Sequence, residues 1–366
     1  MKRRSLVGAL GVGAAAALSG CNSGSQQATA DCKTESTSKT IEWTMITTWP
    51  KGFQGTGEGA EYLAKVINDL SGGRIKVTVL GANELVPAYE VFDTVASGTV
   101  QMGHGASYYW KGKLPISPIF AAVPFGLNAQ EMNGWLLKGG GLELWQELYE
   151  PLGLIPMPGG NTGVQMAGWF NKEIKSLEDI KGLKMRIPGL GGEVFKRAGG
   201  TPELIAPAEL YSALERGRID ATEWIGPYND LAFGLHKAAK FYYYPGWHEP
   251  GTTLEALINK DAFNALPNDL QVIVKQACLL ANSDMLAEVT LKNNAALQTL
   301  INEHNVQLRK LPNDVLNKFE EISEVVVSEL AASDPFAQKV YDSYMAYKKQ
   351  VYQWHQVSEQ AFYQLR

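Results

Sequence analysis

A glutamate beside a tryptophan, Glu223 and Trp224, ends the stretch of this chain that is best suited to chemistry. The apolar spacing of a helix ends at Gly217, and a short strand-like run then delivers Glu223 next to the large ring. A carboxylate beside apolar surface is costly to keep ionised unless a cation or hydrogen-bond donors meet it. Arg186 follows another strand-like run, and its guanidinium can hold a carboxylate in a two-point fork. From spacing alone, Glu223 could equally be an ordinary surface acid at the end of an element.

Four segments around these residues resemble one protein family. They are Ser176–Gly189, Gly217–Trp224, Asn161–Met166 and Tyr242–Glu249. The first two are similar to the core signature of the extracytoplasmic solute-binding subunits of TRAP transporters. The other two, together with the Glu-Trp ending, resemble the branch that binds 2-oxo acids or 2-hydroxy monocarboxylates together with a metal ion. The resemblance extends from about Ile41 to the C-terminus.

The resemblance implies an α/β fold like that of periplasmic binding proteins, with two lobes, mainly parallel sheets, a cleft between the lobes and long C-terminal helices. It also implies a function, which is to capture a small organic-acid anion such as pyruvate and deliver it to a TRAP membrane permease. Arg186 would hold the ligand carboxylate, and the ring of Trp224 would pack on the apolar tail.

The residues expected to contact the ligand are Trp49, Tyr108, Tyr109, Asn161, Gln165, Arg186 and Trp224. The aromatic residues of the first lobe, with Thr47, are candidates for closing over the ligand and excluding water. Aromatic residues at such positions are also common in protein cores, so this second interpretation stays open.

The same resemblance implies a metal ion held by Gln165, Glu223 and the backbone carbonyl of Trp224, with Glu249 as a further candidate. These are hard oxygen donors, which suit sodium or calcium and not zinc or copper. If both glutamates line the site, they and a ligand carboxylate carry three negative charges, and Arg186 returns one positive charge. Each unpaired like-charge contact at about 4 Å costs roughly 4 kcal/mol at an effective dielectric near 20. Calcium would neutralise this set, whereas sodium suffices if Glu249 points away.

The N-terminus has the pattern of an export signal. Lys2–Arg4 precede an apolar run, rich in Ala and Gly, that ends at Leu18 and is too short for a stable membrane span. We therefore expect residues 1–20 to be a signal peptide, and the arginine pair is compatible with the twin-arginine route as well as the ordinary one. The stretch ending at Cys21 resembles a lipobox, which predicts a lipid on that cysteine. Residues 21–40 are rich in Ser, Thr and Gln and are expected to be a flexible tether in the periplasm.

The charge and the remaining cysteines exclude some partners. The net charge is −5, and loss of Lys2, Arg3 and Arg4 with the signal changes it to −8. This acidity argues against nucleic acid or an anionic membrane surface, so membrane contact is expected only through the permease and a lipid at Cys21. Cys278 lies in an apolar helical pattern and is expected to be a core residue without a disulfide to Cys32.

Strand and helix patterns alternate along the chain, which indicates an α/β fold, and the length favours two lobes. Strands are expected at 41–47, 74–80, 101–106, 154–158 and 164–171, and the chain is expected to recross between the lobes with 252–259. Helices are expected at 58–70, 89–96, 129–149 with a break at the glycines 139–141, and from Pro267 onward. We expect residues 41–160 to form the first part of lobe I and 161–255 to form lobe II. Residues 256–330 would return to lobe I with connecting helices, and 331–366 would form a C-terminal helix.

The C-terminal helix carries an unusually aromatic stripe. It consists of Val340, Tyr344, Tyr347, Val351, Trp354, Val357 and Phe362. The stripe could pack on the body of the same subunit, or it could meet a partner in a homodimer. In the branch that this chain resembles, a swapped C-terminal helix makes a dimer, so we expect a homodimer here.

The sequence argues against an enzyme. The five histidines, His104, His236, His248, His304 and His355, show no spacing for a metal cluster. Nucleophile elbows, Cys-His pairing signals and phosphate-cradling loops are missing from the sequence. Two rival interpretations stay open. One is a metal-independent dicarboxylate or sugar-acid receptor that uses Arg186, and the other is a secreted hydrolase with a carboxylate pair.

Overall fold

The structure, a computed structural model, describes residues 39–366. The predicted signal peptide, the lipobox cysteine Cys21, Cys32 and nearly all of the predicted tether therefore lie outside the described residues.

The first strands of the described chain belong to a five-stranded sheet. Its strands are ordered β2-β1-β3-β10-β4. They are β1 Ile41–Thr47, β2 Ile75–Leu80, β3 Met102–Gly105, β4 Leu154–Asn161 and β10 Thr253–Asn259. β10 runs antiparallel to both of its neighbours, and the other strands share one direction.

A six-stranded sheet follows, ordered β11-β9-β5-β8-β6-β7. Its strands are β5 Gly168–Phe170, β6 Lys184–Arg186, β7 Thr201–Glu203, β8 Ala221–Thr222, β9 Phe241–Tyr244 and β11 Gln307–Lys310. β5 is antiparallel to β8 and β9, and the remaining pairs are parallel. Two mainly parallel sheets with helices confirm the predicted α/β class.

The antiparallel strands β5 and β10 each follow a passage from one sheet to the other. We call residues 162–167, between β4 and β5, the first crossing segment, and residues 245–252, between β9 and β10, the second crossing segment. Their backbones bond to each other, since Thr162 N donates to Thr252 O at 3.0 Å and Gln165 N donates to Glu249 O at 3.2 Å. A Cβ on Gly246 would lie 2.1 Å from Gln165 O, so this close approach requires glycine.

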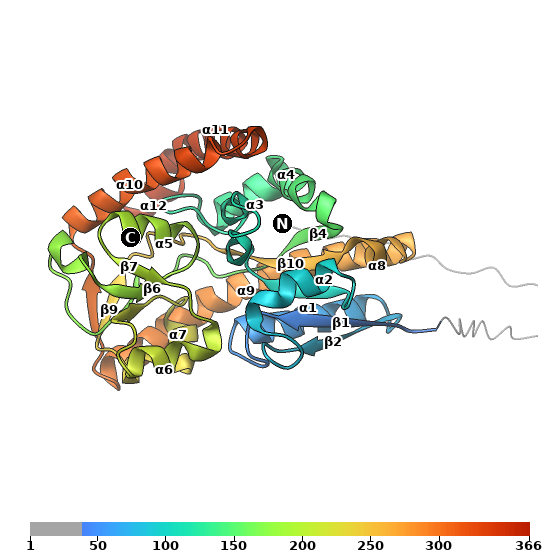
Figure 1. Cartoon of the computed structure of the whole chain (residues 1–366), viewed down its shortest axis with the longest axis horizontal. Helices are drawn as coiled ribbons and strands as arrows, with labels where there is room; N and C mark the ends of the chain where they lie inside the picture. The colour runs from blue at the N-terminus through green and yellow to red at the C-terminus, as the bar shows by residue number, and fades with distance from the viewer. Residues whose placement is uncertain (1–38) are drawn as a thin grey trace, which may run out of the picture. The chain divides into compact units, whose positions relative to one another are not determined.

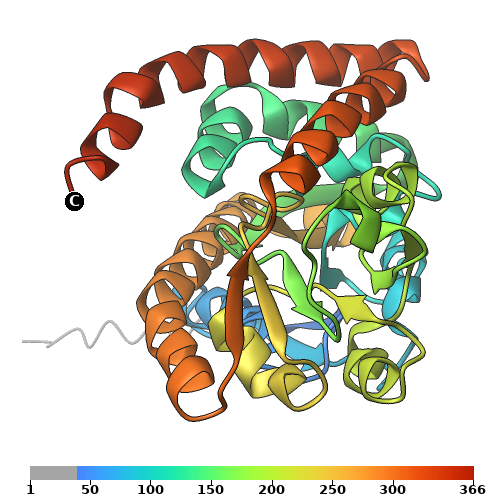
Figure 2. The ribbon, with the colours of Figure 1, turned by 90° about the vertical axis from the view of Figure 1, so that its left-hand side faces the viewer.

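Helices cover the two sheets, as Figures 1 and 2 show. Their bounds are α1 Thr56–Leu70, α2 Val91–Ala96, α3 Ala129–Lys138, α4 Gly141–Tyr149, α5 Gly189–Arg197, α6 Leu210–Glu215, α7 Pro227–Phe233, α8 Lys260–Asn264, α9 Asn268–Asn302, α10 Asn313–Ala331, α11 Pro335–Val357 and α12 Glu359–Tyr363. The break between α3 and α4 falls at the expected glycines, where Gly140 adopts a φ of 85°.

Helix α9 connects the cores of both sheets. Its first turns, with Val274 and the fully buried Cys278, pack with α1 in the core of the five-stranded sheet. Farther along, Met285 and Leu300 belong to a second core cluster that includes Trp169 of β5. The helix is therefore shared by both sheets, and Cys278 is a core residue as expected.

β7 and β9 were not among the expected strands, and β11 departs from the expected organisation as well. The range 256–330, predicted as a return to lobe I, contains β11, which pairs with β9 of the six-stranded sheet. Its four residues are half-buried or exposed and include Arg309 and Lys310. A short, charged edge strand lacks the apolar alternation by which strands are found in a sequence, so pattern reasoning missed it.

The described part of the chain offers no helix that combines the length and the apolarity needed to cross a bilayer.

A carboxyl group lies buried in the middle of the five-stranded sheet. Glu255 of β10 is fully buried, and Trp110 Nε1 donates to its Oε2 at 2.7 Å. Burial raises the pKa of Glu255 to about 7, against smaller lowering effects of Trp110 and Tyr149. The folded protein therefore favours the neutral form of this side chain.

Glu255 should make the free energy of unfolding depend on pH. Its folded pKa lies above the usual 4.5, so its stabilising contribution is complete below about pH 4.5 and is lost as the pH rises through about 7. Glu255→Gln keeps a neutral side chain at every pH. As the pH rises from 5 to 8, the free energy of unfolding of the variant should therefore fall by roughly 2 kcal/mol less than that of the wild type. Urea denaturation in EDTA at both pH values measures this difference. Identical losses in the two proteins would contradict the assignment.

Candidate functional site

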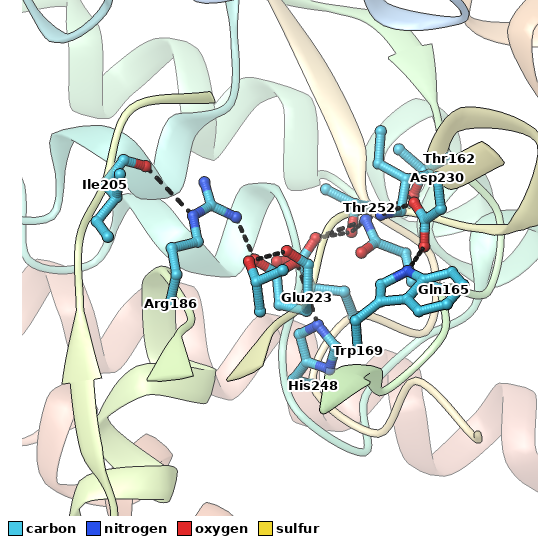
Figure 3. Close-up of polar contacts among 12 residues, drawn as sticks. Thr162, Gln165, Trp169, Arg186, Ile205, Glu223, Asp230, His248 and Thr252 are labelled. Carbon is cyan, nitrogen blue, oxygen red and sulfur yellow. Dashed lines mark hydrogen bonds and ion pairs between the residues drawn. The ribbon is translucent and has the colours of Figure 1, made fainter. Parts of the chain in front are cut away.

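The predicted arginine and glutamate lie together at the end of two neighbouring parallel strands. Arg186 ends β6 opposite Thr222 of β8, and Glu223 is the next residue, so both side chains leave the same edge of the sheet. Arg186 Nη1 donates to Glu223 Oε1, and each side chain is only 1% exposed (Figure 3). The guanidinium also donates through Nε to Ile205 O at 3.3 Å. The sequence thus builds a buried ion pair, not a surface acid.

A glycine in the neighbouring strand allows β8, the strand before Glu223, to pack close to β5. Gly168 of β5 has a φ of 122°, and a Cβ there would lie 2.6 Å from Thr222 O. Any side chain at this position would push β8 away and displace Glu223 from Arg186.

The two crossing segments contribute the next polar group of the site. Gln165 Nε2 donates to Glu249 Oε2 at 2.8 Å and to Thr252 Oγ1 at 3.2 Å. Thr252 Oγ1 donates to the same oxygen of Glu249 at 2.6 Å. Gln165 Oε1 is buried and has no hydrogen-bond partner among the described residues. An amide oxygen left without a donor is a ready ligand for a hard cation.

A cluster of metal-ligating side chains forms between these groups. Glu223, His248 and Glu249 are buried, and each offers a ligand atom within 4.8 Å of the others. His248 Nε2 lies 3.5 Å from Glu223 Oε2 (Figure 3). The two carboxylates and the free oxygen of Gln165 fit a cation that prefers oxygen ligands, whereas the imidazole of His248 offers nitrogen and is not a ligand for such an ion.

His248 lies in this cluster although the sequence analysis did not list it as a site residue. It sits beside the candidate Glu249 in sequence, and that adjacency was the available signal. The spacing could not show that the second crossing segment reaches the end of β8, because this contact depends on how the two sheets are joined.

The charges of the site are only partly balanced. Burial opposes ionisation of Arg186, but the Glu223 carboxylate keeps its pKa well above the usual value. Burial, and after it the neighbouring Glu223, raise the pKa of Glu249 to about 7, although His248 and Thr252 act to lower this pKa. One arginine faces two acids, so a second positive charge would stabilise the ionised form of Glu249.

Aromatic rings surround the ion pair. The Arg186 guanidinium lies 5.7 Å from the Trp224 ring centre, and Arg186 Nη2 donates to the Tyr109 hydroxyl at 3.3 Å. The Trp49 ring lies 6.1 Å from Tyr109 and 6.3 Å from Trp224, and Tyr108 stacks edge-on against Tyr109 at 4.8 Å. Trp224 Nε1 is buried and has no hydrogen-bond partner within residues 39–366. The structure therefore gathers the predicted aromatic residues around Arg186.

Two predicted residues make other contacts. Asn161 Oδ1 accepts from Gly163 N at 2.9 Å, so this side chain fixes the start of the first crossing segment. Thr47 Oγ1 donates to Trp49 O at 2.7 Å and holds a local turn. Both side chains shape the backbone near the site.

Asp230 is a buried residue that the sequence analysis missed. Its carboxyl group accepts from Trp169 Nε1 at 2.9 Å, Tyr242 OH at 2.7 Å and Ile225 N at 3.1 Å. It thereby fixes the backbone just after Trp224. Burial raises its pKa to about 7. Its hydrogen-bond donors come from separate strands and turns, so no local sequence motif predicted that Asp230 would be buried here.

Comparison with known proteins shows the family of the chain. Residues 48–334 match the family model described as bacterial extracellular solute-binding protein, family 7. The chain belongs to this family. As a member of family 7 it is a receptor of the TRAP type, which confirms the predicted resemblance and places its class in the periplasm.

Three relatives of this family 7 protein are informative. A Nostoc protein named monocarboxylate 2-oxoacid-binding periplasmic protein is 46% identical over 322 residues, 88% of each chain. A TRAP periplasmic solute-binding protein from Pseudoalteromonas atlantica, solved with bound sodium and pyruvate, is 44% identical with a TM-score of 0.86, over 89% of this chain and 99% of that one. One from Colwellia psychrerythraea, solved with calcium and pyruvate, is 42% identical with a TM-score of 0.87, over 90% and 100%.

The buried ion pair generates a stability prediction for the ligand-free protein. Glu223→Gln leaves the Arg186 charge buried without its counterion and should lower the free energy of unfolding by about 3 to 5 kcal/mol. Combining it with Arg186→Met removes that unpaired charge and should recover most of the loss. Urea denaturation in EDTA of both single variants and the double variant measures the coupling. Additive effects of the two changes would contradict a direct pair.

Proposed function

We propose that this protein captures pyruvate, or a similarly small 2-oxo or 2-hydroxy monocarboxylate, together with a metal ion and delivers it to a TRAP membrane permease. One observation carries the proposal. A buried arginine able to hold a carboxylate adjoins an oxygen-rich cluster, Glu223 and Glu249 with the free oxygen of Gln165, able to hold a cation. The pyruvate and metal ions bound by two relatives with more than 40% identity support it.

The chain's own residues explain why ligand and ion would bind together. Arg186 now donates to Glu223, so its fork is already occupied. Glu223 and Gln165 would hold the ion, with the Trp224 carbonyl as a third oxygen, and the ion supplies a positive charge to adjacent carboxylate and 2-oxo oxygens. With that charge beside Glu223, Arg186 is free to turn part of its guanidinium to the ligand carboxylate without leaving an acid unpaired.

The enclosure of the site favours a small ligand. Arg186, Glu223 and Trp224 are at most 4% exposed. A ligand can enter only if the two sheets separate about the crossing segments, which is the hinge motion of periplasmic receptors. The rings around Arg186 suit a short apolar tail such as a methyl group.

We propose that calcium is preferred to sodium. Glu249 points into the cluster with Glu223, so two acids and a ligand carboxylate face a single arginine. A divalent ion balances this set, whereas a monovalent ion leaves one negative charge in a buried place.

Calorimetry of EDTA-treated protein with pyruvate tests the proposed function. Pyruvate should bind with micromolar or better affinity when calcium is present, more weakly with sodium alone, and not measurably in EDTA with potassium as the counterion. Arg186→Lys should weaken binding at least tenfold, because an ammonium cannot reproduce the fork. Metal-independent binding, or tighter binding of succinate or a uronate, would favour the dicarboxylate or sugar-acid receptor instead. NMR of the same samples should show unchanged pyruvate, and conversion would reveal an enzyme.

We also propose that the protein forms a homodimer through the end of its C-terminal helix. The aromatic stripe divides in two, because Val340 and Tyr344 are fully buried against the body. Trp354 and Val357 are 61% and 72% exposed, and Phe362 of α12 is exposed as well. Large apolar side chains exposed together are typical of a surface that another subunit covers.

Charged substitutions in this surface should separate the subunits. Trp354→Asp combined with Phe362→Asp should convert a dimer to a monomer in sedimentation velocity. Gln353→Asp, at an exposed polar position of the same helix, is the matched control and should leave the mass unchanged. A wild type that sediments as a monomer at all concentrations would rule the dimer out.

Lipid attachment at Cys21 stays a proposal, since that residue lies outside the described part. Mass spectrometry of the mature N-terminus from the native host would decide it, because an unmodified or absent Cys21 excludes the anchor.

A further inference from the structure

The second crossing segment, which carries His248 and Glu249, rests on a loop of the first half of the chain. We call residues 124–128, just before α3, the support loop. Phe125 N donates to Trp247 O at 2.8 Å, and the two rings lie 5.9 Å apart. At the other end of the segment, a Cβ on Gly251 would lie 2.3 Å from Ala129 N, the first residue of α3. The segment is therefore in contact with this part of the chain on both sides of His248 and Glu249.

Helix α11 holds the support loop from its outer side. Tyr344 OH accepts from Leu127 N at 2.8 Å, and Lys348 Nζ donates to Phe125 O at 2.8 Å. Tyr352 OH donates to Gly126 O at 2.7 Å and to Phe125 O at 3.2 Å. The three residues are spaced four apart and share one face of the helix. Every one of these bonds is made to the backbone of the loop, so they fix its course.

The support loop depends on this external hold. Phe125 has a φ of 53°, a left-handed conformation that residues other than glycine seldom adopt and that persists only when surrounding structure fixes it. Its carbonyl accepts from Lys348 and Tyr352, both on α11. Its amide is the group that bonds to Trp247. The strained residue thus links the helix directly to the crossing segment.

Helix α11 is itself fixed to α3, the helix that follows the loop. His355 Nδ1 lies 2.5 Å from Glu131 Oε1, and Trp135 Nε1 donates to Ser343 Oγ at 3.1 Å. Figure 1 shows α11 above α3 and α4, and the same packing is visible in Figure 2. These contacts with α3 fix the position of α11, the helix that binds the support loop.

We propose that Tyr352 and Lys348 are positioning residues for the ligand site, which they influence by fixing the support loop and through it the Trp247–Glu249 backbone. They touch neither the ligand nor the ion. Their role is to keep Glu249 turned toward Glu223, so the C-terminal helix takes part in binding. The inference rests on the proposed function for its ligand, but the coupling itself is measurable without one.

The test uses the full mature chain with Tyr352→Phe and Lys348→Met combined. Tyr347→Phe is the matched control, because this tyrosine lies on the same helix and its hydroxyl makes no hydrogen bond with the described residues. Amide hydrogen exchange of the ligand-free proteins should be faster over residues 245–252 in the double variant and unchanged in the control. The dissociation constant for pyruvate at saturating calcium should rise about tenfold in the double variant only.

A third comparison separates positioning from general destabilisation. In a Glu249→Gln background, the same pair of changes should alter the dissociation constant by less than about twofold, because their effect passes through Glu249. If the double variant merely melts at a lower temperature, with exchange over 245–252 and affinity like the control, the inference is overturned. If the wild type binds no pyruvate with any ion, the proposed function fails, and the exchange comparison alone still decides whether α11 is coupled to the crossing segment.

Discussion

Burial of the Arg186 charge beside Glu223 is the interaction on which the arrangement of the site depends. A guanidinium and a carboxylate that are both 1% exposed have lost their hydration, so each needs the other or another group of the same charge as its partner. The site also contains Glu249, a second acid that the arginine cannot satisfy. An anion alone would add to the excess of negative charge, and a cation alone would leave Arg186 competing for Glu223. Only the two together keep every charge paired, which gives an electrostatic reason for joint binding.

The two crossing segments connect the sheets and also carry the proposed ligand residues. Gln165 belongs to the first crossing segment, and His248 and Glu249 belong to the second. Through these segments the chain enters β5 and leaves β9. The Gln165–Glu249 hydrogen bond ties the passages together at the position where the ion would lie. If metal ligands lie on segments that act as a hinge, the distances between these ligands depend on the angle between the two sheets. Binding of the ion and closure of the sheets over the ligand would then occur together.

Much of this could be predicted from the sequence, and the exceptions share a cause. The strand at 41–47, the α/β class and the choice of Arg186 and Glu223 as site candidates follow from local patterns and from family motifs. Their direct ion pair was not predicted, because Arg186 was expected to hold the ligand carboxylate and Glu223 the metal ion. His248 and Asp230 were missed because their roles arise from contacts between segments far apart in the chain. β11 was missed because a short edge strand carries charged residues at positions where apolar ones would reveal it. Pattern reasoning detects faces of single elements, and these residues act where elements meet.

The position of the C-terminal helix follows from the same need for fixed geometry. Oxygen ligands for a hard cation must be held within a fraction of an ångström, yet Glu249 sits on a connection without regular secondary structure. Such a connection gains precision only from what packs behind it. Here that support is a strained loop, and the loop is fixed in turn by three side chains of one long helix. Helix α11, which is also proposed to meet a second subunit, is thereby joined to the site through hydrogen bonds to the loop backbone. It can therefore influence the site without touching the ligand.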